Sequence, residues 1–259
     1  RRTTSSAGPQ RLNYTWHWRV LLETEPGGTG TYLHYLLVGL GWTLATALTA
    51  WVIALALGAL VGTVRTTDLR WLVRLGNLYV EIFRNVPLIV QMFLWFFVVP
   101  ELLPQALGDW IKQVPPPWVS YIPAVLCLGI FTSVRVAEQV RAGIQSLPRG
   151  QRMAGTALGL TGVQTYRHVV LPQALRIILP PLTSEFMNVI KNSSVALTIG
   201  LLELTGRARA MQEFSFRVFE AFTAATLIYL LTNLLVVLLM RALERKVRVP
   251  GLIALHTDH

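Results

Sequence analysis

The sequence predicts an all-α, multi-pass membrane protein with five membrane-spanning helices and one short helix in a connecting loop. Two observations lead to this fold class. Of the 259 residues, 53% are hydrophobic and only 14% are charged, whereas an average soluble domain has roughly 25% charged residues. The chain also contains long stretches without any charge, and about 20 apolar residues are enough for a helix to cross a bilayer.

Three uncharged stretches predict three of the spans. They are residues 35–64, 113–134 and 221–240. Each stretch is long enough to cross the hydrocarbon core as a single α-helix. We therefore expect the first, third and fifth membrane helices at these positions.

Two further stretches, residues 71–100 and 172–202, are apolar but contain charged side chains. Charge inside a bilayer is costly unless it faces protein or water, so we interpret both as spans whose charges point into the protein. Pro87 in the first stretch can kink its helix. For either stretch, the alternative is an interfacial or re-entrant helix. The charged residues are Arg74, Glu81 and Arg84 in the first stretch and Arg176, Glu185 and Lys191 in the second.

The positive charges predict the orientation of the chain. Twelve of the 23 Lys and Arg residues fall in the first loop, the third loop and the C-terminal end, and eight fall on the opposite side. Because Lys and Arg accumulate in cytoplasmic loops, we expect the N-terminus outside and the C-terminus in the cytoplasm. The expected domains are an extracytoplasmic arm (1–30), a transmembrane domain (31–248) and a cytoplasmic tail (249–259).

The composition argues against several classes of function. Basic cytoplasmic loops and anionic lipid head groups explain the net charge of +10, so no nucleic-acid partner is expected. None of the three lysines lies in a GxxxxGK[ST] phosphate loop. The histidines lack metal-ligand spacing, and Cys127 alone cannot form a disulfide or a cysteine metal cluster. We therefore expect no cofactor and no catalytic group, which favours a transport component over an enzyme.

The loop at residues 147–174, LPRGQRMAGTALGLTGVQTYRHVVLPQA, resembles a signature of ABC importer permeases. The signature is Glu-Ala-Ala, three residues, Gly, nine residues and Ile-x-Leu-Pro. Gly159 and the pair Leu171 and Pro172 match its second half, with Val169 at the Ile position. The first half departs from the signature, and the residues in place of Glu-Ala-Ala are Met153, Ala154 and Gly155.

Other segments extend the resemblance to permeases of polar amino-acid importers, and those for glutamate and aspartate are the most similar. The matching segments are residues 81–91 (EIFRNVPLIVQ), 138–150 (EQVRAGIQSLPRG), 191–197 (KNSSVAL) and 244–251 (ERKVRVPG). The resemblance implies ATP-driven amino-acid import across a bacterial inner (plasma) membrane. It also implies four partners: cytoplasmic ATP-binding subunits that hydrolyse the ATP, a second permease subunit (alike or different), an extracytoplasmic amino-acid binding protein, and membrane lipid.

In such permeases a short cytoplasmic helix couples the ATPase to the membrane helices, and the matching segment here is about residues 150–162. Small side chains allow such a helix to seat in a groove. A glycine permits a turn or a close backbone approach, and a proline suits the first turn of the next helix. The alternative is an ordinary amphipathic helix on the membrane surface. The expected coupling residues are Ala154, Gly155, Gly159, Leu171 and Pro172.

The first candidate for substrate binding lies at the end of the third span. Arg135, Glu138 and Arg141 are three residues apart, so they share one stripe of a helix. Polar amino-acid permeases commonly have an aromatic residue where this chain has Arg135, and a guanidinium binds carboxylates through two parallel hydrogen bonds. We therefore expect Arg135 and Glu138 to contact an acidic substrate. The alternative is that Arg135 only neutralises Glu138.

The second candidate lies on the fourth span. Glu185, Asn188 and Asn192 recur at spacings of three and four, which predicts one polar stripe, and Lys191 adjoins it. Lys191 would be a second partner for a carboxylate, and Asn188 and Asn192 would orient the substrate. The hydroxyl-rich segment 193–198 is expected to satisfy a helix break near the middle of the membrane. The alternative is that these polar groups only hold neighbouring helices together.

Two rival functions remain at the level of sequence. An ion-coupled secondary amino-acid transporter or channel subunit would also have charged intramembrane helices and a central polar site. A membrane enzyme is the weaker rival, because no grouping of nucleophile, base and metal is recognisable.

Overall fold

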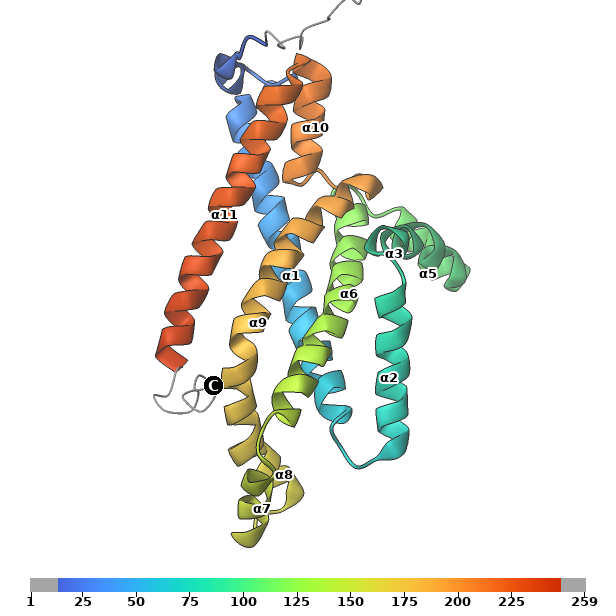
Figure 1. Ribbon diagram of the computed structural model, residues 1–259. Coiled ribbons are helices and arrows are strands. Elements are labelled where there is room, and N and C mark those ends of the chain that lie inside the picture. Colours follow the sequence, from blue (N-terminus) through green and yellow to red (C-terminus); the bar gives the residue numbers. More distant parts are fainter. Residues whose placement is uncertain (1–13, 248–259) are drawn as a thin grey trace, which may run out of the picture.

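The computed structural model describes residues 14–247, and the elements within this range are helical (Figure 1). Four of them are short 3-10 or π-helical segments: η1 (Trp18–Leu22), η2 (Leu94–Val98), η3 (Tyr166–Val170) and η4 (Ser193–Ile199). The α-helices are α1 (Tyr32–Val64), α2 (Arg70–Asn85), α3 (Leu88–Phe93), α4 (Val99–Leu102), α5 (Gln105–Lys112), α6 (Trp118–Gln145), α7 (Arg149–Ala157), α8 (Gly162–Thr165), α9 (Leu171–Asn192), α10 (Leu204–Ser215) and α11 (Val218–Val247).

Helices α1, α6 and α9 form the centre of the bundle, with α10 at one end and α7 at the other (Figure 1). Two glycines allow α1 and α6 to pack closely. A Cβ atom on Gly58 would lie 2.5 Å from the Cβ atom of Val136, and one on Gly62 would lie 2.7 Å from the carbonyl oxygen of Ala137. The small-xxx-small pair on α1 therefore brings the two backbones together, as it does in other membrane helices.

Three of the expected spans are confirmed as helices long and apolar enough to cross a membrane. They are α1, α6 and the part of α11 from Val218 to Arg245. Helix α6 begins at Trp118, five residues later than the uncharged stretch, because the prolines at 115–117 have no N–H groups and cannot continue a helix. It then extends to Gln145, past the charged residues at its far end.

The second expected span is not one straight helix over residues 71–100. Helices α2 and α3–α4 meet at an angle of 100°, so they form either one broken span or a re-entrant loop. The bend falls at Val86 and Pro87, because proline disfavours helical geometry in the residue before it. The side-chain amide of Gln91 donates hydrogen bonds of 2.9 Å to the carbonyl oxygens of Phe83 and Val86, which the bend leaves without helical partners.

The fourth expected span consists of α9 followed by η4, and the change of helix type at Ser193 confirms the expected irregularity. The hydroxyl groups of Ser193, Ser194 and Thr198 each donate to a carbonyl oxygen three residues earlier, at 2.7–2.8 Å. The segment ends at Gly200, whose φ of 85° suits glycine. Helix α9 is not among the helices that are long and apolar enough to cross a membrane, so a total of five spans stays a prediction.

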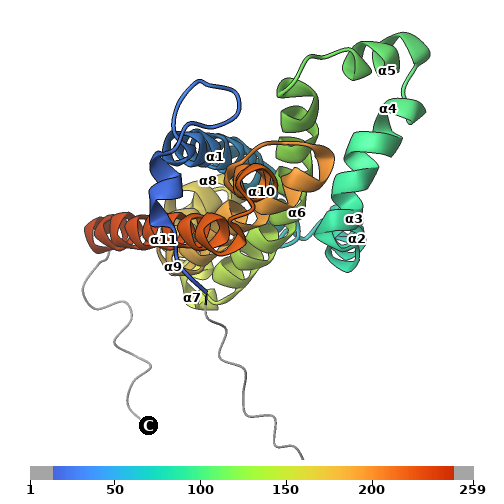
Figure 2. The ribbon, with the colours of Figure 1, turned by 90° about the horizontal axis from the view of Figure 1, so that it is seen from above.

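The segment that follows the bend forms an arm beside the bundle. Helix α3 packs against α6, whereas α4 and α5 extend beyond it before the chain returns to α6 through the prolines at 115–117 (Figure 2). Within the arm, the Lys112 ammonium lies 2.7 Å from a carboxylate oxygen of Glu101.

The described part of the expected N-terminal arm, residues 14–30, packs on the α10 end of the bundle. The backbone N–H of His17 donates a 2.7 Å hydrogen bond to the Glu220 carboxylate on α11, and the Tyr14 hydroxyl donates to the same group. An isolated antiparallel bridge pairs Thr24 with Thr31 just before α1 begins. The expected tail at 249–259 lies outside the described residues.

Candidate functional site

The polar contacts between the central helices divide the charged residues of α6 into two groups. Glu138 belongs to the first group. Its Oε1 accepts a 2.9 Å hydrogen bond from Arg65 at the end of α1, and its Oε2 accepts one of 3.1 Å from Arg141. The Nε atom of Arg65 also donates to Asn77 on α2. Both oxygens of Glu138 are therefore engaged in a contact that joins α1, α2 and α6.

Arg135 belongs to the second group, and its ionic partner is Glu185 on α9 rather than Glu138. Its Nη1 atom lies 3.7 Å from Oε2 of Glu185, and the guanidinium carbon lies 5.5 Å from the centre of the Phe131 ring. The Arg135 side chain is 49% exposed and that of Glu185 only 12%. The alternative that Arg135 merely neutralises Glu138 is therefore wrong.

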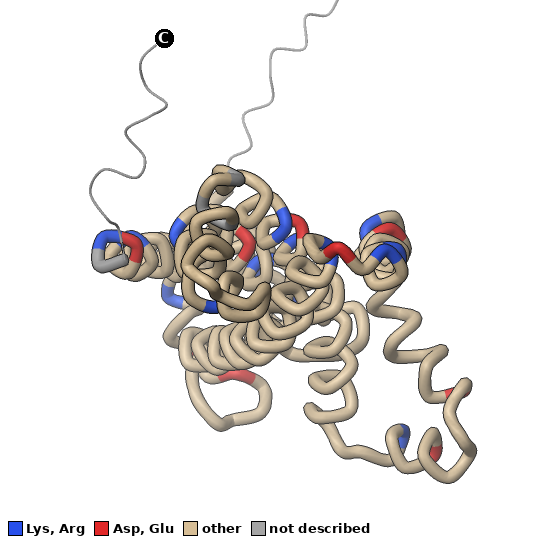
Figure 3. The backbone as a smooth tube through the Cα atoms, turned by 90° about the horizontal axis from the view of Figure 1, so that it is seen from below, with Lys and Arg blue, Asp and Glu red and all other residues tan. Residues whose placement is uncertain are grey.

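The polar stripe on α9 lies beside this pair. The side-chain amide of Asn188 is 3.5 Å from Oε2 of Glu185, and Asn188 and Asn192 are half-buried. Lys191 is exposed and has no ion-pair partner within residues 14–247. The structure thus brings Arg135, Glu185 and Asn188 together, while Lys191 is not part of that contact. Viewed from the α7 end, charged positions gather near the centre of the bundle and on helices that flank it (Figure 3).

A second buried polar cluster, which the sequence analysis missed, joins α1, α10 and α11. Glu203 precedes α10 and accepts hydrogen bonds from the backbone N–H groups of Thr205 (3.0 Å) and Gly206 (2.8 Å). It also accepts bonds from the hydroxyl groups of Tyr229 (2.8 Å) and Thr43 (3.2 Å). An acidic residue directly before a helix is a recognisable capping signal. The hydroxyl partners come from helices far away in sequence, so no local pattern could reveal them.

The expected coupling segment forms α7, which projects from the end of the bundle opposite α10 (Figure 1). Gly159 ends this helix with a φ of 75°, and the N–H of Leu160 returns to the carbonyl oxygen of Gly155 at 3.1 Å. A Cβ atom on Gly159 would meet nothing within 4 Å. Of the two expected roles, Gly159 therefore provides the turn and not a close approach.

The close approach occurs at Gly155 instead. A Cβ atom there would lie 2.8 Å from the methyl group of the buried Thr165, so α7 packs directly on α8. Ala154 is exposed on α7, and Leu171 is partly buried against the core near α9. Pro172 opens α9, as expected, although the preceding π-helical turn η3 runs into α9 without a stop.

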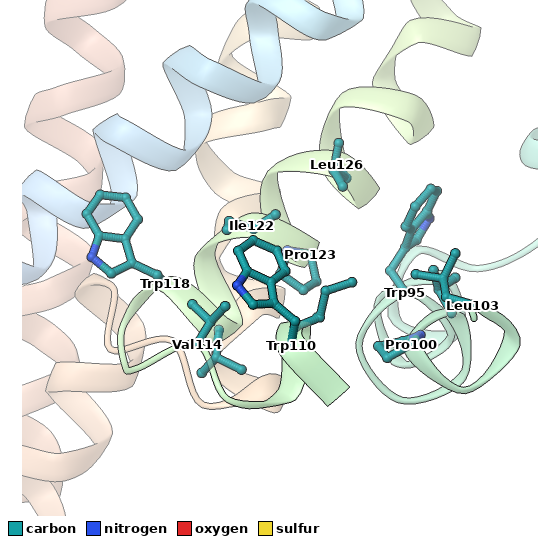
Figure 4. A pocket seen from close by; sticks show the side chains of 12 residues that line it. Trp95, Pro100, Leu103, Trp110, Val114, Trp118, Ile122, Pro123 and Leu126 are labelled. Carbon is teal, nitrogen blue, oxygen red and sulfur yellow. The ribbon is translucent and has the colours of Figure 1, made fainter. Parts of the chain in front are cut away.

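A cavity of about 320 Å³ lies between the arm and α6 (Figure 4). Its walls are hydrocarbon and indole side chains, including Trp95, Trp110 and Trp118. A wall without charged groups cannot bind a carboxylate, so the cavity is separate from the candidate site at Arg135. Within the described residues, no three His, Cys, Asp or Glu side chains are grouped as they would be to hold a metal ion.

A bundle of long apolar helices, with ion pairs between its central helices and one projecting short helix, is typical of a membrane-embedded transport component. Comparison with known proteins names the family. Residues 54–249 match the family described as "Binding-protein-dependent transport system inner membrane component", and the chain belongs to this family of ABC transporter permeases. It is therefore a permease subunit, and ATP is hydrolysed by a partner subunit rather than by this chain.

Two bacterial relatives align with three quarters or more of the chain. The glutamate/aspartate import permease protein GltJ of Escherichia coli (strain K12) is 49% identical over 241 residues, which cover 93% of this chain and 98% of GltJ. The glutamine transport system permease protein GlnP of the same strain is 33% identical over 196 residues, covering 75% of this chain and 84% of GlnP.

Solved structures agree with the fold. The crystal structure of an amino acid ABC transporter with histidines matches with a TM-score of 0.71 and 30% identity, over 83% of this chain and 95% of the other. The MetNI methionine ABC transporter in an inward-facing conformation matches with a TM-score of 0.63 and 19% identity, over 84% and 96% of the two chains. The second match supports the fold alone.

Proposed function

We propose that this chain is a permease subunit of an ATP-driven importer for glutamate and aspartate. The 49% identity to GltJ over nearly the whole chain supports the acidic substrates. The observation that carries the proposal is the half-exposed guanidinium of Arg135 on the central helix α6, whose one ionic contact within the described residues is 3.7 Å long. A guanidinium can bind a carboxylate through two parallel hydrogen bonds, which suits an acidic ligand.

The proposed site consists of Arg135 with Asn188, Asn192 and Lys191 along α9. Glu138 is assigned the role of holding α6 to α1 and α2, because Arg65 and Arg141 already engage both of its oxygens. Helix α11 supports a second permease subunit in the assembly, because only 17% of its most apolar stretch is buried within the chain. A partner helix and lipid would cover the rest.

The proposed orientation places the α7 end in the cytoplasm and the α10 end outside. The balance of Lys and Arg between the loops supports it. In this orientation the ATP-binding subunits would contact α7, and an extracytoplasmic amino-acid binding protein would deliver the substrate at the α10 end.

Uptake by vesicles that contain the full assembly tests this function. We expect ATP-dependent uptake of labelled glutamate and aspartate, and little uptake of glutamine or histidine.

Replacement of Arg135 by Tyr should lower glutamate uptake about tenfold or more, since hydrogen bonds to charged groups contribute about 1.5–3 kcal/mol. The control is Arg74→Tyr, which removes an exposed arginine from α2. Uptake driven by an ion gradient without ATP would contradict the importer, and an unchanged ligand profile in Arg135→Tyr would contradict the role of Arg135.

A further inference from the structure

The ion pair between Arg135 and Glu185 differs from the other ion pair on α6 in how completely it is satisfied. Glu138 has both carboxylate oxygens bound by arginine donors at 2.9 and 3.1 Å. The 3.7 Å contact of Arg135 with Glu185 is longer than a hydrogen bond. Both oxygens of Glu138 are therefore occupied. Arg135 and Glu185, in contrast, each retain atoms that can form further hydrogen bonds.

The unused donors and acceptors on each side of the second pair can be identified. A guanidinium carries five N–H donors, and those of Arg135 make no hydrogen bond within residues 14–247, so a carboxylate can approach them. On Glu185, the ion pair and the amide of Asn188 both involve Oε2. Oε1 accepts no hydrogen bond from the described residues, so it can accept one from a cation.

An amino acid carries the two charges that this pair lacks. Its carboxylate matches the open guanidinium of Arg135, and its α-ammonium group matches the open oxygen of Glu185. We propose that Glu185 binds the α-ammonium group of the substrate, and that the Arg135–Glu185 pair opens to receive the amino acid between its two charges. This inference rests on the proposed function and adds a second residue that determines specificity.

The exchange leaves neither charged group without an ionic partner, which is why it is favourable in this place. Breaking a buried ion pair by removing one partner is costly, because a buried charge is left alone. A ligand with only a carboxylate would take Arg135 and leave the largely buried Glu185 without a cation. A zwitterionic ligand gives each of the two groups a new ionic partner in place of the one contact that is lost. The pair would therefore discriminate amino acids from dicarboxylates that lack the amine.

Competition binding to the purified permease–ATPase assembly tests the inference, with labelled glutamate as the probe and glutarate as the competitor. Glutarate differs from glutamate only by the missing α-amine. In the parent assembly we expect glutamate to bind at least tenfold more tightly than glutarate. In Glu185→Gln we expect this ratio to fall towards one, mainly through weaker binding of glutamate. A ratio that stays at the parent value would overturn the inference.

Two further variants separate recognition from structural support. Glu244→Gln removes a carboxylate that contacts Thr183 of α9 from the side of α11, so it changes a charge beside α9 without touching Arg135. It should keep the parent ratio. The double variant Arg135→Glu, Glu185→Arg restores the ion pair in reverse. If the pair only holds helices together, this variant will recover glutamate binding; if the pair receives the substrate, the variant will assemble but not bind.

The parent assembly distinguishes failure of this inference from failure of the proposed function. If it shows no ATP-driven uptake and no binding of acidic amino acids, both are overturned. If it takes up and binds glutamate while Glu185→Gln keeps the parent ratio, only the role of Glu185 is rejected.

Discussion

At the scale of single residues, Glu203 shows how a carboxylate can be held inside a membrane protein. Four donors from three helices surround it, so both of its oxygens are hydrogen-bonded. Such a group is more costly to truncate than to keep, because its partners would lose their acceptor in a buried place.

Replacement of Glu203 by Ala should therefore destabilise the protein by about 2–4 kcal/mol, since several buried donors are left unsatisfied. Unfolding of the purified chain by increasing SDS measures this loss. The control is Glu213→Ala on α10, the helix that Glu203 caps. It removes only an exposed pair with Arg209 and should change stability by less than about 1 kcal/mol. Equal effects of the two substitutions would show that the buried cluster contributes no more to the free energy of unfolding than an exposed ion pair does.

The position of Arg135 could be predicted from the sequence, but its ionic partner could not. The sequence identified Arg135 as unusual, because a charge in a span requires a partner or a water-exposed surface. It did not identify the partner of Arg135. Glu185 lies on another helix, and the relative rotation of two helices depends on packing between them, which no single stretch of sequence encodes. Thr43 and Tyr229 could not be predicted as partners of Glu203 for the same reason, because they lie on other helices.

At the scale of elements, the apolar helices were the most predictable part of the fold. Uncharged stretches predicted α1, α6 and α11 because length and apolarity are the physical requirements for crossing a bilayer. The α2–α3 unit was predicted less well. Pro87 marked a kink, but its angle depends on contacts such as those of the Gln91 amide with the carbonyl oxygens of the bend.

The C-terminal turn of α7 gives an element-scale prediction. Gly159 has a φ of 75°, where an L-residue costs about 1–2 kcal/mol. Gly159→Ala should loosen this turn and lower ATP-driven uptake several-fold, with the amount of protein in the membrane unchanged. The matched control is Gly162→Ala, since a Cβ atom on Gly162 would also meet nothing within 4 Å, and its φ is not in the left-handed region. Equal uptake in both variants would argue against a role for the turn.

At the scale of the whole molecule, the two ends of the bundle carry different surfaces. The α7 end exposes large apolar side chains on α7 and at its C-terminal cap, with Met153 at 70% and Leu158 at 79%. Exposed apolar residues on a short projecting helix are typical of a surface that is covered by a partner. This surface is where we expect the ATP-binding subunit to bind.

The double variant Met153→Asp, Leu158→Asp should weaken binding of the ATP-binding subunit at least tenfold, or about 1.4 kcal/mol. Co-purification from detergent-solubilised membranes at several subunit ratios measures the change. Phe216→Asp alters an equally exposed apolar residue at the α10 end, so it should leave this association intact. Undiminished binding by the double variant would place the contact elsewhere on the chain.

The enclosure of α6 has a consequence for how this chain can change over evolutionary time. Its most apolar stretch is 61% buried, against 17% for α11, so most of α6 already has a neighbour within the chain. A substitution there must be matched by a second one on another helix, whereas α11 can exchange one apolar residue for another wherever it faces lipid. Among related chains, α6 should therefore drift slowest, and its changes should come in pairs with α1 and α9.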